Sequence, residues 1–200
     1  MNLPLDPTRG PPPSLDDHAN GKPNWPLTRV HGHGGGGWYP FMALFGREQG
    51  LSHRRILVEG IRGPFRIYNA HLQYSRGAAE MEIVDSSGVA VYGIKNEKWA
   101  VAALARNSRN LQITGLGGPA RIPSEGGKFR LENCRNVVLA NLLADFFQIQ
   151  ILEDPRGTES GGSYPEPKPD ASYPFIVEVT PEGERLETGP YERPCVYKRS

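Results

Sequence analysis

Apolar residues recur at every second position in several short segments in the middle of the chain. In one of these segments, Met81 and Ile83 precede a polar stretch, and Val89 and Val91 follow it. Because successive side chains of a β-strand point to opposite faces, this spacing predicts two strands, each with one buried face, joined by a turn.

The same arrangement returns along the chain, which is the sequence signature of a repeat architecture. Segments 81–94, 102–116 and 129–142 align without gaps, and 57–70 is a weaker copy with an extra residue in its turn. The apolar residues form four columns, which are Met81, Ala103 and Phe129; Ile83, Ala105 and Leu131; Val89, Leu111 and Val137; and Val91, Ile113 and Leu139. Such short strands at intervals of 22 and 26 residues, with no helix between them, predict an all-β parallel β-solenoid.

Further columns lie in the turns, and they are Asp85, Asn107 and Asn133; Ser86, Ser108 and Cys134; and Gly88, Asn110 and Asn136. Glycine and asparagine tolerate a positive φ, so the last column predicts a tight turn that recurs in every coil. Side chains of the first column can stack from coil to coil and bond to the backbone of the turn. Because Cys134 falls in a column of small residues, a structural role is favoured over a catalytic one.

The coils "DSSGVAVYGI", "RNSRNLQITGL" and "ENCRNVVLANL" resemble those of the right-handed parallel β-helix of the pectate-lyase-like superfamily. The resemblance covers about residues 55–152 and implies four to five coils. It also implies an association with carbohydrate, although the superfamily includes lyases, hydrolases, epimerases, phage adhesins and inert scaffolds. The chain can equally be the C-terminal part of a longer β-helix of glycoside-hydrolase or lyase type.

The chain divides into a Pro/Gly-rich arm and lead-in loop (1–54), the β-helix (55–153), and a loop, last strand and capping tail (154–200). Residues 1–30 show no strand or helix pattern, and their prolines favour an extended backbone packed on the solenoid or on a second copy. Residues 146–153 can add a coil. Residues 172–180 read as a last strand, and the residues after it can fold over that end.

The charge balance, with 23 basic and 22 acidic residues, argues against nucleic acid as a partner. No apolar run approaches the roughly 18 residues that a membrane span needs. The chain start lacks the apolar core of a signal peptide. Either the protein is cytoplasmic, or an export signal is missing and it is extracellular or at the cell surface. Cys134 and Cys195 favour two free thiols over one disulfide.

Sugar hydrolysis needs two carboxyl groups about 5–10 Å apart, which coils stacked at about 4.8 Å can supply. The outward-facing candidates are Glu82, Asp85 and Glu132, with Glu80 beside them, and Arg106 is the candidate base of a lyase. The outward columns mix both signs of charge, which is also typical of a solvated sheet face. Whether the protein is an enzyme therefore stays open; a glycoside hydrolase or a polysaccharide lyase are the options.

Aromatic side chains on or between the coils are candidates for stacking on sugar rings, and they are Tyr68, Tyr74, Tyr92 and Trp99. The alternative is that they are ordinary surface or interface residues.

The stretch "HGHGGGG" places His31 and His33 on one side of an extended segment, as two ligands of a metal ion would lie. The alternatives are a loop for a polar ligand, or a lead-in to the first coil with Trp38, Tyr39 and Phe41 as its lid. The last is favoured, and we expect no cofactor.

Two functions remain. One is a carbohydrate-associated β-helix, related to polysaccharide hydrolases or lyases, that acts as an oligomer. The other is a non-catalytic structural β-solenoid, a fibre or filament subunit that packs on copies of itself through its arm and its open end.

Overall fold

The computed structural model describes residues 14–17, 26–32, 34–39, 53–72, 79–96, 100–117, 127–142, 174–188 and 196–200. All regular elements in these ranges are strands, and none of the described residues belongs to a helix able to cross a membrane. The strands are β1 (Ser14–Asp17), β2 (Thr28–His31), β3 (Gly36–Trp38), β4 (Ile56–Glu59), β5 (Phe65–His71), β6 (Ala79–Val84), β7 (Val89–Lys95), β8 (Val101–Arg106), β9 (Arg109–Gly117), β10 (Phe129–Glu132), β11 (Arg135–Leu142), β12 (Ile176–Val179), β13 (Arg185–Glu187) and β14 (Val196–Arg199).

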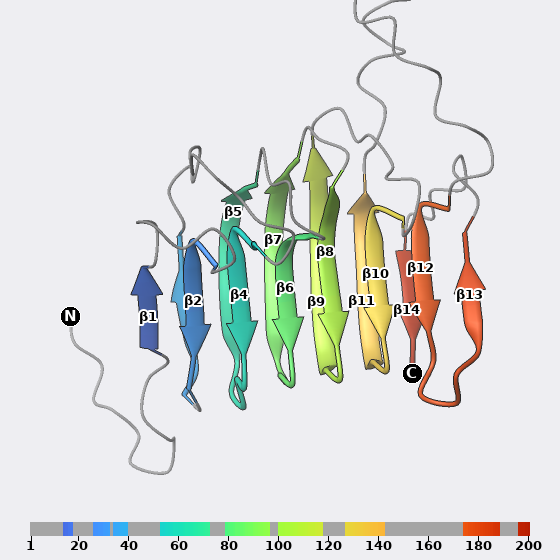
Figure 1. Ribbon diagram of the computed structural model, residues 1–200, viewed down its shortest axis with the longest axis horizontal. Coiled ribbons are helices and arrows are strands. Elements are labelled where there is room, and N and C mark those ends of the chain that lie inside the picture. The colour runs from blue at the N-terminus through green and yellow to red at the C-terminus, as the bar shows by residue number, and fades with distance from the viewer. Residues whose placement is uncertain are drawn as a thin grey trace, which may run out of the picture.

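The strands form two sheets, and the chain alternates between them. One sheet (sheet A) has the order β1-β2-β4-β6-β8-β10-β12-β13, and the other (sheet B) has the order β14-β11-β9-β7-β5-β3. Each even-numbered strand from β2 to β10 is followed by its odd-numbered partner in the facing sheet, and successive coils pair in parallel (Figure 1). The predicted parallel β-solenoid is thus confirmed.

The regular part of the solenoid amounts to about three turns, slightly fewer than the four to five coils that the sequence predicted. The difference arises at the ends, where β3 and β12 are short and the chain leaves the path of the coils to pair antiparallel.

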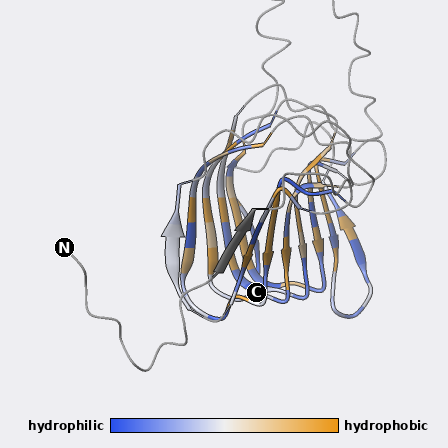
Figure 2. Ribbon diagram, turned by 60° about the vertical axis from the view of Figure 1, so that its left-hand side comes forward, coloured by the Kyte–Doolittle hydropathy of each residue, from blue (hydrophilic) through white to orange (hydrophobic). Residues whose placement is uncertain are grey.

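The columns read from the sequence are the columns of the structure. Met81 pairs with Ala103, which pairs with Phe129, and Val91 pairs with Ile113, which pairs with Leu139. These side chains are buried between the two sheets in one continuous core. Figure 2 shows the result as apolar bands that cross the strands at matching levels. Each buried aliphatic side chain of this kind stabilises the fold by roughly 1.5–3 kcal/mol.

The turn between the sheets is held by stacked amides. Asn133 Nδ2 donates to Asn107 Oδ1 at 2.8 Å, and Asn136 Nδ2 donates to Asn110 Oδ1 at 2.7 Å. All four residues have a positive φ, as do Asp85 and Gly88 in the next coil. The sequence predicted a positive φ for the Gly88 column only; the Asp85 column needs it too, and Asp and Asn are the residues with side chains that most readily adopt it.

Antiparallel strands close the C-terminal end. The predicted last strand is β12, which pairs in parallel with β10, and β13 then pairs antiparallel with β12. In the facing sheet, β14 pairs antiparallel with β11, where Tyr197 donates a hydrogen bond to Glu178. Burial raises the pKa of Tyr197, and the nearby Glu178 carboxylate raises it further. Residues 146–153 lie outside the described residues.

The N-terminal end differs from the prediction. Residues 1–30 were expected to carry no strand, but β1 and β2 lie there, and β1 pairs antiparallel with β2. Proline-rich flanks concealed these four-residue strands, because a period of two is hard to recognise over so short a length.

The histidine- and glycine-rich stretch is also more than a lead-in. It connects β2 to β3, so it forms the turn of a coil rather than the approach to one. Gly35 is required here, since a Cβ at that position would lie 2.6 Å from the Pro64 carbonyl oxygen. Trp38 packs against the core as expected, whereas Tyr39 remains 67 % exposed. Phe41 lies outside the described residues.

Candidate functional site

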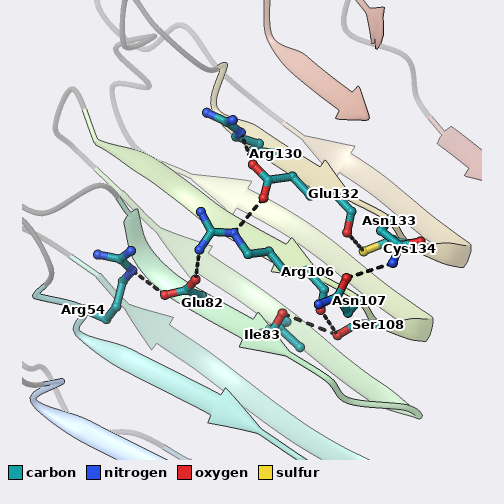
Figure 3. Close-up of polar contacts among 10 residues, drawn as sticks. All are labelled: Arg54, Glu82, Ile83, Arg106, Asn107, Ser108, Arg130, Glu132, Asn133 and Cys134. Atoms are coloured by element: carbon teal, nitrogen blue, oxygen red, sulfur yellow. Dashed lines mark hydrogen bonds and ion pairs between the residues drawn. The ribbon is translucent and has the colours of Figure 1, made fainter. Parts of the chain in front are cut away.

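A ladder of alternating arginine and glutamate side chains runs along the outer face of sheet A (Figure 3). Arg54 Nε donates to Glu82 Oε2 at 2.7 Å, and Arg106 donates to Glu82 Oε1 at 2.9 Å. Arg106 Nε also donates to Glu132 Oε2 at 2.7 Å, and Arg130 completes the ladder through an ion pair of 2.6 Å with Glu132 Oε1. Three of the four candidate catalytic residues therefore meet.

The ladder leaves its carboxylates fully engaged. Both oxygens of Glu82 and Glu132 Oε2 accept hydrogen bonds from arginine nitrogens, and Glu132 Oε1 forms an ion pair with Arg130. Neither carboxylate is placed to hand a proton to a glycosidic oxygen or to activate a water molecule in this arrangement. Asp85, the fourth candidate, lies in the exposed turn with the stacked amides. The ladder acts first as a clamp between coils.

A second polar group is buried, and it was not predicted from the sequence. Arg55 Nε lies 3.8 Å from Glu80 Oε2, and both side chains are 0 % exposed. Glu80 was expected to face outward with Glu82, but it lies at the corner where the coil enters β6, and the strand alternation does not hold there. Burial lowers the pKa of Arg55, and the Glu80 carboxylate opposes that effect. In the same column, the buried Lys128 donates to Asn96 and to the Ala100 carbonyl oxygen.

Three tyrosines stack along the outer face of sheet B. The ring of Tyr68 lies between those of Tyr39 and Tyr92, at centroid distances of 4.6 and 5.3 Å. Tyr39 ends the stack and is the exposed ring, and the Tyr92 hydroxyl donates to Gln112 Oε1 at 3.5 Å. Thr114 continues the column beside Tyr92. Tyr74 and Trp99 lie outside the described residues.

The tyrosine stack predicts a graded loss of stability. Tyr68→Ala removes two stacked pairs and should lower the free energy of unfolding by about 1–3 kcal/mol, whereas Tyr39→Ala removes one pair and should cost about 0.5–1.5 kcal/mol. Urea unfolding followed by tryptophan fluorescence measures both values. Equal losses in the two variants would show that the middle ring does not bridge its neighbours.

A groove lies beside this tyrosine column, where the strands of sheet B end. Asn69, Gly93, Gly115 and Asn141 form the column that follows the tyrosines, and all four have a positive φ. The glycines leave the middle of the column without side chains, and a hollow of about 510 Å³ results. Its remaining lining comes from the ends of the strands and includes His71, Lys95 and Gly117. The groove was not predicted from the sequence, although the column of Asn69, Gly93, Gly115 and Asn141 is visible in the aligned coils.

The proposed metal ligands stay a prediction. His31 ends β2, and His33 lies outside the described residues. Within the described ranges, no three His, Cys, Asp or Glu side chains are grouped so that they could hold a metal ion.

Cys134 is buried and unpaired with another cysteine, in line with its place in the column of small residues. Its Sγ donates to the Glu132 carbonyl oxygen at 3.4 Å, and burial raises the pKa of its thiol. A buried thiol with a raised pKa is a poor nucleophile, so this residue belongs to the packing of the turn.

The described part of the protein belongs to the class of parallel β-solenoids, and it carries ladders of ion pairs, amides and aromatic rings along its coils and an open groove at the ends of the sheet B strands. Comparison with family models, with curated proteins and with solved structures finds no match to this chain.

Proposed function

We propose that the protein is a carbohydrate-associated β-solenoid, similar to the pectate-lyase-like superfamily, which binds a sugar chain in the glycine-floored groove. The observation that carries this proposal is the groove itself, with an asparagine at each end and two glycines in between, the Asn69 amide leaning over the first of them. As part of this proposal, the protein acts outside the cell or at the cell surface.

The dimensions of the groove suit a short stretch of polysaccharide. Asn69 and Asn141 are three coils apart, which corresponds to about 14 Å at a strand spacing of about 4.8 Å. An extended ligand can therefore lie across four coils and meet an amide at either end. Amide groups both donate and accept hydrogen bonds, as sugar hydroxyls do.

The tyrosine column supports the same ligand. Tyr68 precedes Asn69 in the chain, and Tyr92 precedes Gly93, so two tyrosines of the stack border the groove. Tyr39 offers its open ring face at one end of the stack, where a sugar ring can pack.

The proposal is one of binding, and it assigns no catalytic step to the arginine–glutamate ladder. A hydrolase or lyase acting at Glu82, Glu132 or Arg106 would first have to break ion pairs that hold four coils together. The ladder is therefore better explained as part of the scaffold that keeps the groove in shape.

Gly117→Leu should block the groove and weaken sugar binding about tenfold. Gly117 lines the groove in the same column as His71 and Lys95, and a Cβ there meets no atom within 4 Å, so the new side chain enters open space. Affinity gel electrophoresis with soluble xylan, polygalacturonate and dextran measures the effect. We expect the native protein to be retarded by at least one of them.

Arg185→Leu, on the exposed strand β13, is the matched control and should bind as the native protein does. Thermal unfolding shows whether both variants remain folded. Native mobility with all three polysaccharides would contradict the proposal, and so would full binding by a folded Gly117→Leu variant.

A structural, self-assembling role is the second candidate, and one observation favours it. β3 is the terminal strand of sheet B, and Gly36, Gly37 and Tyr39 are exposed there. A second copy can add to this edge. Light scattering between micromolar and millimolar concentrations tests it: growth of the particle that Tyr39→Ala abolishes would support assembly, and a monomer at every concentration would exclude it.

A further inference from the structure

A second hollow, of about 210 Å³, lies at the opposite side of the coils, in the turn that joins sheet A to sheet B. Three arginines line it, Arg62, Arg109 and Arg135, together with the amides of Asn107 and Asn133 and two serine residues of the turn. It shares no residue with the groove of the proposed function, and none of its lining residues is acidic.

The charge in this hollow is less compensated than that of the ladder. Within the described part of the chain, Arg62 and Arg109 are exposed and have no carboxylate partner. Arg135 lies 3.5 Å from Glu182, but both side chains are largely exposed, at 66 % and 72 %. Exposed pairs of this kind contribute little, so a ligand can displace Glu182 at low cost. In the amide column, Asp85 lies one coil before Asn107 and directly before Ser86, so one exposed carboxylate flanks the hollow.

The arginines follow the axis of the solenoid. Arg109 and Arg135 are direct partners in neighbouring strands, about 4.8 Å apart. On the other side, Ser87 bridges to Arg109 and donates its N–H to the Ile61 carbonyl oxygen, so Arg62 lies two coils before Arg109. The hollow thus presents guanidinium groups in a row, with amides and hydroxyls between the row and the sheet.

We propose that this arginine-lined hollow binds an acidic polysaccharide through the carboxylate or sulfate groups of successive sugar units. A guanidinium group binds two oxygens of such an anion at once, and three guanidinium groups along the solenoid axis can each meet a charged group of one extended polymer. The exposed amides of Asn107 and Asn133 can bind the sugar hydroxyls, whereas the two serine hydroxyls are buried and bonded within the turn. The same row would attract a nucleic acid by charge, but the lining contains no aromatic ring on which a base could stack.

The test compares four polymers in affinity electrophoresis and in titration calorimetry: polygalacturonate, dextran sulfate, uncharged dextran and poly(U). We expect binding to polygalacturonate or dextran sulfate that weakens as salt rises, and none to dextran through this hollow. The double variant Arg62→Ala/Arg109→Ala should bind the acidic polymer at least tenfold more weakly. Arg66→Ala/Arg185→Ala, which removes the same charge from exposed sites outside the hollow, should bind as before.

The variant Gly117→Leu separates this proposal from the previous one. It should leave binding to dextran sulfate unchanged, because it alters only the groove. Equal losses in the two double arginine variants would reduce the effect to general charge and overturn the site. Tighter binding of poly(U) than of either acidic polysaccharide would overturn the choice of ligand, and absence of binding to both acidic polymers would overturn the proposal as a whole.

Discussion

Glu80→Ala is expected to lower the free energy of unfolding by about 3–5 kcal/mol, the usual cost of removing one partner from a buried ion pair. Arg55 would then be a fully buried guanidinium without its counter-charge. Burial lowers the pKa of Arg55 and the Glu80 carboxylate raises it, so removing Glu80 takes away the interaction that favours the charged form. Chemical denaturation with urea at neutral pH measures the change.

The double variant Arg55→Met/Glu80→Leu is the informative control. Replacing both charges by apolar side chains of similar size should restore most of the loss, because a buried ion pair typically contributes little net stability compared with good apolar packing. If the free energy of unfolding of Glu80→Ala were within about 1 kcal/mol of the native value, water would have to reach Arg55, contrary to its burial here.

Ile113→Ala should cost about 2–5 kcal/mol, because it leaves a cavity in a column that the neighbouring coils cannot close. Ile113 is buried between Val91 in the preceding coil and Leu139 in the following coil. Both neighbours are fixed by the strand pairing of their own coils, so the side chains have little freedom to collapse into the space.

Thr114→Ala, at the next position of β9 but on the outer face, is the matched control and should change stability by no more than about 0.5 kcal/mol. Thermal unfolding of the two variants measures both losses of stability. If both variants lost equally little stability, Ile113 would not point into the core, and the assignment of inner and outer columns would have to be reversed.

The apolar columns were predictable because strand alternation and coil spacing are both local in the sequence. Gaps of 22 and 26 residues place Val89, Leu111 and Val137 in one column, and the structure has the same register. The outward residues were harder. Arg106 pairs straight along its column with Glu132, but it also reaches diagonally to Glu82, and an alignment of columns does not show diagonal neighbours.

The corners of the coils were the least predictable part of the fold. Alternation placed Glu80 outside with Glu82, but the bend that starts β6 turns Glu80 into a buried position. The bend depends on how neighbouring coils pack, which a single segment does not reveal. The groove is a different case. Its column of two asparagines and two glycines, all with a positive φ, could have been recognised in the sequence as a bend, and the two glycines indicate a place where side chains are absent.

The pairing of each coil with its immediate neighbours alone has a consequence for how such a protein can change in size. One additional unit of 22–26 residues would lengthen the molecule by about 4.8 Å and disturb contacts at a single boundary. The antiparallel terminal strands would simply move apart with it. Length in this architecture is therefore an adjustable property, and a sequence can gain or lose reach in whole steps while the rest of the molecule keeps its form.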